Sequence, residues 1–131
     1  MTGPEWLSLE DVLQIHRDQI ERYGGAFGVR NSAALEGCLA RPKNLMFYES
    51  PDIFDLAACY SYGLVKNHCF VDGNKRTGFV SGVVFLLENG FLLPPTASDA
   101  AQLFEGVAAG LRSEIEIADF FRNFSLPLPP D

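Results

Sequence analysis

Apolar residues recur at helical spacing through most of this 131-residue chain, and capping residues divide them into segments. In the first segment, Ser8 and Asp11 form a pattern that resembles a capping box, and apolar positions then repeat three and four residues apart. Gly24 and Gly25 follow, and glycine readily takes the left-handed conformation that ends helices. The pattern predicts a first helix that ends at Tyr23.

A short second helix is expected to begin at a cap on Asn31 or Ser32 and to run to about Ala40. Pro42 should end it, because proline lacks a backbone N–H and its ring disfavours helical geometry in the residue before it. Residues 42–50 therefore read as a loop.

Two apolar helices are predicted in the middle of the chain. Ser50-Pro51-Asp52 reads as a helix start with proline at the first helical position, and residues 53–66 are apolar on nearly every face. A helix that is apolar all round belongs in the centre of a bundle. After a break at residues 68–73, a second such helix should run from about Asn74 to Glu88.

The remaining sequence predicts two more helices. One should run from near Ser98-Asp99 to near Arg112, and Ser113 with Glu116 forms a capping box for a last helix to about Phe124.

Together these segments predict an all-α fold in one domain, residues 1–125, followed by a loose Pro-rich tail at residues 126–131. Residues 83–87 alone would also suit a buried strand. The length of the surrounding apolar pattern and the lack of partner strands favour a helix.

Composition narrows the functional classes. A net charge of −7 opposes general nucleic-acid binding, which needs a basic surface. The longest apolar stretch is too short to cross a bilayer, no signal peptide is visible, and the three cysteines show no disulfide framework. These features predict a cytoplasmic protein without a membrane or a direct nucleic-acid partner. Up to Arg76 the chain has eight basic and ten acidic residues, but after it only two basic and seven acidic, so Lys75 and Arg76 suit one small anion.

The break at residues 68–73 leads into a helix N-terminus, where unpaired N–H groups and the helix dipole favour phosphate. Gly73 allows the backbone to approach a ligand closely. Lys75 supplies a point charge and Arg76 a bidentate fork, two complementary ways to hold phosphate oxygens. Asn74 can either donate to a phosphate or hold the loop.

The same segment contains a base and a metal ligand. Asp72 is its only carboxylate, and one carboxylate together with ligand phosphates is the usual way in which Mg²⁺ is bound. His68 could accept a proton from an incoming hydroxyl. The set suits phosphoryl or nucleotidyl transfer, in which positioning and charge neutralisation dominate catalysis.

Taken singly, each of these residues is more often structural than functional, and Phe70 reads as a core anchor for the loop. A nucleophilic Cys69 activated by His68 is disfavoured, because neighbouring side chains rarely face each other. A zinc site from His68, Cys69 and Asp72 has the wrong spacing. The spacing of the whole set, rather than any one member, predicts an active site.

The sequence His68-x-Phe70-x-Asp72-Gly73-Asn74-Lys75-Arg76-Thr77 resembles the signature of the Doc (death-on-curing) toxins, a branch of the Fic superfamily. Similarity extends over roughly residues 8–124 and implies a compact six-helix bundle of the Fic/Doc type. It also implies that His68 activates a target hydroxyl, that Asp72 binds Mg²⁺, and that Gly73, Asn74, Lys75 and Arg76 contribute to binding ATP.

Two positions depart from the wider Fic pattern. Fic adenylyltransferases usually have glycine at the position of Lys75 and a second arginine at that of Phe79. In Doc-like proteins this difference is associated with transfer of the γ-phosphate rather than AMP. Glu36 fits an inhibitory glutamate pattern of some Fic enzymes, but the arginine with which it would pair is missing, so we interpret it as an ordinary helix residue.

The resemblance therefore implies a kinase toxin of a type II toxin-antitoxin system that phosphorylates elongation factor Tu and arrests translation. Its expected partner is an antitoxin that folds on binding as a helix in a groove. Three alternatives stay open: AMP transfer to a protein hydroxyl, a non-catalytic nucleotide-binding module, and an acidic helical interaction domain without a ligand.

Overall fold

The computed structural model describes residues 3–95 and 99–130, and it has six helices and one small two-stranded sheet in this part of the chain. The elements are α1 (Leu9–Tyr23), α2 (Ser32–Tyr48), α3 (Ile53–Lys66), α4 (Asn74–Glu88), β1 (Phe91–Leu92), α5 (Ala100–Ala108), α6 (Glu114–Phe124) and β2 (Leu126–Pro127). The expected all-α class and six-helix bundle are confirmed.

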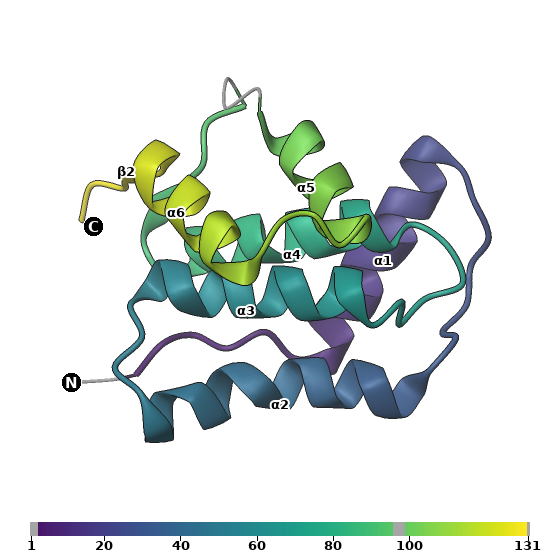
Figure 1. Ribbon diagram of the computed structural model, residues 1–131, viewed down its shortest axis with the longest axis horizontal. Coiled ribbons are helices and arrows are strands. Elements are labelled where there is room, and N and C mark those ends of the chain that lie inside the picture. The colour runs from purple at the N-terminus through teal and green to yellow at the C-terminus, as the bar shows by residue number, and fades with distance from the viewer. Residues whose placement is uncertain (1–2, 96–98, 131) are drawn as a thin grey trace.

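Helices α3 and α4 form the centre of the bundle and make the most extensive helix contact in the described part (Figure 1). α2 lies along one side of α3, α6 packs on another, and α1 contacts α4. Close approach of the central pair depends on small residues. A Cβ on Gly78 would lie 2.9 Å from the carbonyl oxygen of Ser61, and the Ser61 hydroxyl donates to the Gly78 carbonyl at 2.7 Å. The loop that joins the two helices is therefore held on a rigid base.

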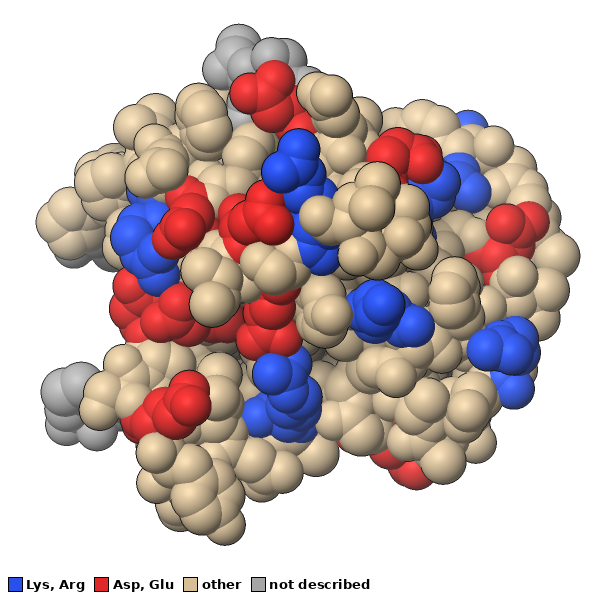
Figure 2. All heavy atoms as spheres, viewed as in Figure 1, with Lys and Arg blue, Asp and Glu red and all other residues tan. Residues whose placement is uncertain are grey.

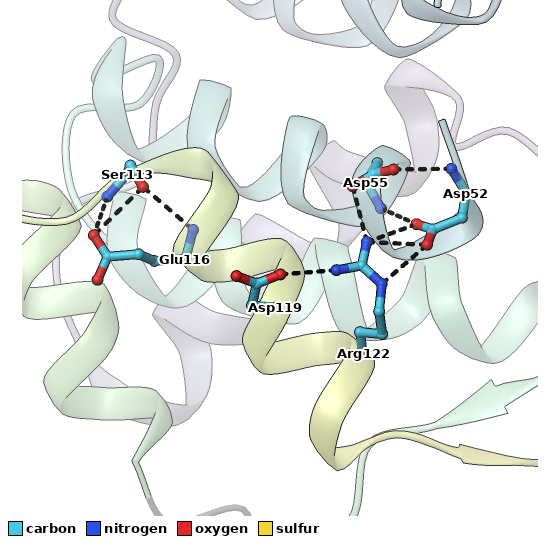
Figure 3. Close-up of polar contacts among 6 residues, drawn as sticks. All are labelled: Asp52, Asp55, Ser113, Glu116, Asp119 and Arg122. Carbon is cyan, nitrogen blue, oxygen red and sulfur yellow. Dashed lines mark hydrogen bonds and ion pairs between the residues drawn. The ribbon is translucent and has the colours of Figure 1, made fainter. Parts of the chain in front are cut away.

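The capping predictions are confirmed at both ends of the chain. Ser8 with Asp11 and Ser113 with Glu116 form reciprocal capping boxes at the starts of α1 and α6, the latter drawn in Figure 3. α1 ends at Tyr23 as predicted, and residues 83–87 belong to α4 rather than to a strand.

The prediction that Pro42 ends the second helix is wrong. α2 continues through Pro42 to Tyr48, so most of the expected loop at residues 42–50 is helical. Leu35, Cys38 and Pro42 are the buried residues of α2, and they recur at helical spacing, so the proline ring itself belongs to the buried face. A proline inside a helix costs about 3 kcal/mol. Packing of this face against α3 outweighs that cost.

Two smaller boundaries also differ, and a third agrees with the expectation as far as it is described. Pro51 lies outside α3, because Asp52 is the N-cap and forms a capping box with Asp55. α5 ends at Ala108 instead of near Arg112, since Gly110 has a left-handed φ of 78°. Its expected start at Ser98 lies outside the described residues, and the structure begins the helix at Ala100 with Asp99 as N-cap.

The Pro-rich C-terminal segment is ordered by pairing at its start, in contrast to the loose tail expected. Leu126 and Pro127 pair with Leu92 and Phe91 in an antiparallel arrangement, and the N–H of Leu128 donates to the Gly90 carbonyl. The partner strand consists of only two residues, which is too short to stand out in the sequence.

Candidate active site

The loop between α3 and α4 contains two residues in the left-handed backbone region. Gly73 has a φ of 74° and His68 a φ of 45°. Among the described residues, His68 is the one non-glycine residue with a positive φ. This conformation costs a side-chain-bearing residue on the order of 1–2 kcal/mol. The surrounding contacts must therefore hold His68 in place.

Those contacts come from the segment between α1 and α2, which lies antiparallel to the loop. Val29 bridges to Phe70, the N–H of Arg30 donates to the Cys69 carbonyl at 2.8 Å, and the N–H of Val71 donates to the Gly28 carbonyl at 3.0 Å. The Arg30 side chain also donates through Nε to the carbonyl oxygen of His68 at 3.0 Å. The backbone of His68 is thus fixed while its side chain stays exposed.

Phe70 anchors the loop in the core, as predicted. It is buried and stacks on the ring of His16, with ring centroids 3.9 Å apart and an interplanar angle of 8°. His16 donates from Nε2 to the backbone carbonyl of Asp72 at 2.9 Å. Burial lowers the pKa of His16, and the charge of Arg76 lowers it further against the opposing effect of this hydrogen bond. A neutral imidazole therefore positions the backbone of Asp72.

Asn74 uses its whole amide group on the loop. Its Oδ1 accepts from the N–H of Phe70 at 3.0 Å, and its Nδ2 donates to the carbonyl of Phe70 at 2.9 Å. Of the two roles that the sequence left open for Asn74, this geometry favours holding the loop.

The Asp72 carboxylate is exposed and bonded only to neutral donors in the described part of the chain. Its Oδ2 accepts from the N–H of Ala26 at 3.2 Å and its Oδ1 from the N–H of Gly73 at 3.1 Å. Gly25 lies so close that a Cβ there would come within 2.8 Å of Oδ2. Because no cation of the described chain neutralises it, this carboxylate fits the role of a ligand for a divalent ion.

The start of α4 lacks a side-chain cap, because its N-cap residue is Gly73. Its first-turn N–H groups can therefore bind an anion. The two cations of this turn point to different neighbours. Arg76 donates to the carbonyls of Gln19 at 3.4 Å and Gly24 at 3.1 Å, whereas Lys75 pairs with Glu105 of α5 at 2.6 Å.

An apolar groove of about 740 Å³ begins beside these cations and runs between α4, α5 and the segment after β1. Lys75 and Arg76 lie at its polar end, and Phe79 and Phe104 in its walls pack edge to face at a centroid distance of 5.3 Å. The position at which Fic adenylyltransferases usually have a second arginine is thus part of an apolar wall.

Comparison with known proteins agrees with this geometry. The sequence model of the Fic/DOC family matches residues 6–86, which is more than half of the chain and includes α1 to α3, the loop and most of α4. The chain belongs to the Fic/DOC family. Its relatives include "Protein kinase doc" of Escherichia phage P1, 32% identical over 118 residues that cover 89% of this chain and 93% of the relative. "Toxin Doc" of Mycolicibacterium smegmatis is 36% identical over 91 residues, 68% of each chain. Within the family the chain is therefore a Doc protein.

The structure of this Doc protein adds residues that sequence reasoning did not assign to the site. His16 and Arg30 hold the backbone of the His68–Asp72 loop, and Ala26 donates to the Asp72 carboxylate. The available signal for His16 was a histidine on the otherwise apolar face of the first helix. Glu36 lies exposed on α2 and takes part in none of the ion pairs of the described residues.

No helix within the described residues of this Doc protein combines the length and apolar character needed to span a membrane.

Proposed function

We propose that this Doc protein is a toxin that transfers the γ-phosphate of ATP to a serine or threonine hydroxyl of a translation factor, elongation factor Tu, and so arrests translation in the cytoplasm. One arrangement supports this most. The exposed His68 lies in a fixed loop four residues before Asp72, whose carboxylate has no cationic partner among the described residues, and the loop leads into the uncapped N-terminus of α4 with its two cations. The names of the two relatives, a protein kinase and a toxin, support the same activity.

In this proposal each residue has one task. The exposed imidazole of His68 accepts the proton of the target hydroxyl, and the resulting oxygen attacks the γ-phosphorus while the bond to the β,γ-bridging oxygen breaks and ADP leaves. Arg76, Lys75 and the first N–H groups of α4 bind the phosphate oxygens. Gly73 leaves room for the nucleotide, and Asn74 keeps the loop in shape through Phe70.

Mg²⁺ fits the exposed carboxylate of Asp72, which has no cationic partner among the described residues, and it would supply charge neutralisation to the phosphates. The N–H groups of Ala26 and Gly73 orient that carboxylate. A variant such as Asp72→Asn keeps these hydrogen-bond acceptors in part but removes the charge.

Two features favour γ-phosphate transfer over AMP transfer. Lys75 stands where adenylyltransferases of the superfamily have glycine, and its side chain extends toward Glu105. Phe79 replaces the second arginine and packs on Phe104, so this position contributes no additional phosphate ligand.

The decisive experiment compares the two positions of the label. Purified protein, Mg²⁺ and elongation factor Tu are incubated with ATP that is labelled at the γ-phosphate or at the α-phosphate. Label should reach the factor only from the γ position, and His68→Ala should lower the rate by about 10²–10⁴-fold, the usual contribution of a general base.

The same experiment separates the alternatives. Label from the α position would replace the proposal by AMP transfer. Binding of ATP without any labelled product would favour a non-catalytic nucleotide-binding module, and the absence of an ATP-induced thermal shift would favour an interaction domain without a ligand.

The proposed toxin-antitoxin role requires an inhibitory partner. We propose an antitoxin segment that folds on binding and places an amphipathic helix in the apolar groove beside Lys75. Co-expression of a short DNA-binding protein from an adjacent gene should restore growth, and the groove variant Ala101→Glu, at an exposed position of the same groove, should weaken that rescue. Rescue that is unaffected by this variant would locate the antitoxin elsewhere.

A further inference from the structure

Two cysteines that are far apart in the sequence meet directly behind the His68 loop. Cys38 of α2 and Cys69 of the loop have their Sγ atoms 3.7 Å apart, and both side chains are buried and reduced. A disulfide has an S–S distance of about 2.05 Å, so the two sulfurs would need to approach by roughly 1.7 Å. Rotation of the two side chains can supply much of this movement.

The surroundings of Cys38 favour its thiolate. The hydrogen bond with Cys69, together with the hydrogen bond from Asn67 and the charge of Arg41, lowers the pKa of Cys38 to about 7 despite the opposing effect of burial. Asn67 donates from Nδ2 to the Cys38 sulfur at 3.5 Å. The hydrogen bond with Cys38 and burial both raise the pKa of Cys69. Cys38 is thus the more nucleophilic of the two thiols.

Of the two cysteines, Cys38 is the one that borders a groove at the protein surface. It lines a groove of about 470 Å³ between α2 and α3, and Arg41 and Lys66 are the cations of that groove. Gly63 allows the two helices to approach here, since a Cβ on it would lie 3.2 Å from the Cys38 sulfur. Cys69 is fully buried and does not line this groove.

Cys69 is covalently next to His68 and firmly tied to α2. Its backbone carbonyl accepts from the N–H groups of Arg30 and Asn31, and Asn31 is the N-cap of α2. Drawing the Cys69 side chain toward Cys38 would act on a backbone that is already anchored. Because Arg30 holds the carbonyls of both Cys69 and His68, a shift of Cys69 would also displace His68 from its strained left-handed conformation with a φ of 45°.

We propose that Cys38 is a site of reversible oxidation by hydrogen peroxide, that Cys69 resolves the oxidised thiol as a disulfide, and that this disulfide moves His68 and lowers its activity. The last step rests on the proposed function. In the first step the Cys38 thiolate attacks one peroxide oxygen, the O–O bond breaks, and the sulfenic acid forms while the departing hydroxide takes up the proton that the thiol released on ionisation, giving water. The Cys69 thiol then displaces the hydroxyl as a second water, so that two thiols supply the two electrons.

The first test follows the bond itself. The full chain is treated with hydrogen peroxide, alkylated under denaturing conditions and digested without reductant. We expect a peptide that links Cys38 to Cys69, sensitive to dithiothreitol, and oxidation at Cys38 at least tenfold faster than at Cys59. Cys59 is a matched control, because it is also buried but burial raises its pKa to about 12.

Variants identify the order of the steps. Cys69→Ser should trap sulfenic acid at Cys38 that dimedone labels, Cys38→Ser should form no linked peptide, and Cys59→Ser should behave as the parent does. The exposed Met46 serves as an internal check that oxidant was sufficient. If Met46 is oxidised while Cys38 and Cys69 both stay open to alkylation in the parent chain, the proposal is wrong.

The second test follows the consequence for His68. The chain has only two histidines, so the ring proton signals of His68 can be assigned with the His68→Ala variant. Oxidation should shift the His68 signals and lower phosphate transfer at least fivefold, both reversed by dithiothreitol, and Cys38→Ser should show neither change. A linked peptide with unchanged His68 signals would overturn the regulatory step. Failure of the reduced protein to transfer phosphate would count against the proposed function, while the linked peptide and the His68 signals would still decide this inference.

Discussion

Two arginines of this protein, Arg76 at the start of α4 and Arg122 in α6, are held by very different neighbours. Arg122 bonds to three carboxylates: Asp52 and Asp55 at the start of α3, and Asp119 in its own helix (Figure 3). Arg76 bonds to two backbone carbonyls at the end of α1 and lies 5.4 Å over the ring of Tyr23. No described carboxylate lies within ion-pair distance of it.

The difference separates a structural cation from one that remains available to a ligand. Around Arg122 the charges cancel locally. Acidic and basic side chains lie together where α6 packs on α3, as the matching views in Figures 1 and 2 show. Among the described residues, the bonds of Arg76 go to neutral carbonyl groups, and the partial negative charge of a helix C-terminus compensates its guanidinium in part. Its remaining positive field is felt nearby, since it contributes to the lowered pKa of His16.

Exchanging each arginine for glutamine tests this comparison directly and should give the largest effect. Arg76→Gln should weaken ATP binding at least tenfold, which corresponds to about 1.4 kcal/mol, because a charged bidentate phosphate ligand is lost. Arg122→Gln, the matched control, should leave the dissociation constant unchanged. Isothermal titration calorimetry with ATP and Mg²⁺ measures both.

The titration of His16 provides an independent check on the same pair. Its pKa should rise in Arg76→Gln and stay the same in Arg122→Gln, as followed by NMR. Equal ATP affinities in the two variants would remove the distinction between the two arginines.

The two substitutions should have the opposite ranking for stability: Arg122→Gln should lower it more than Arg76→Gln does. In free energy this effect should be somewhat smaller than the effect of Arg76→Gln on ATP binding. Burial acts to raise the pKa of Asp52, but the hydrogen bond from the Asp55 N–H and the pairing with Arg122 outweigh it, so the pKa is lowered. A lowered native pKa means that the unfolded chain binds more protons. The Asp52 carboxylate therefore contributes its full stabilisation when the pH is above its unfolded-state pKa of about 3.9. This contribution is lost as the pH falls through its lower native-state pKa.

Arg122→Gln should consequently lower the free energy of unfolding by about 1 kcal/mol at neutral pH, because these ion pairs are partly exposed and each contributes little. The difference from the parent should shrink as the pH falls below 4. Urea unfolding between pH 2.5 and pH 7 measures this, and a difference that does not depend on pH would show that the charges are not responsible.

Lys75 is intermediate between Arg76 and Arg122, because it pairs with one carboxylate, that of Glu105. Changing this partner should have the smallest effect on ATP binding. Its exposed ion pair with Glu105 must be exchanged for phosphate if Lys75 binds ATP. Glu105→Gln should therefore strengthen ATP binding about two- to threefold, consistent with the modest energy of exposed ion pairs. Asp119→Asn, which alters the Arg122 cluster instead, should have no effect. Weaker ATP binding in Glu105→Gln would indicate that Glu105 positions Lys75 rather than competing for it.

The fold was predictable where its signals are local. Caps at Ser8 and Ser113 and the apolar patterns of α3 and α4 depend on neighbours three or four residues away, and they predicted those helices well. The course of α2 through Pro42 was not predictable in this way. Its continuation depends on packing against α3, which the local preference of proline does not reveal.

The same division applies to the candidate active site. The sequence by itself determined which residues form the loop and the start of α4, because His68 to Arg76 are contiguous and their spacing defines their chemistry. Only the tertiary structure decided what holds them: the bond of His16 to Asp72, the different partners of Lys75 and Arg76, and the contact of Cys38 with Cys69. These contacts join residues about 30 or more positions apart, and such pairs are brought together by the packing of helices, not by any local preference of the chain.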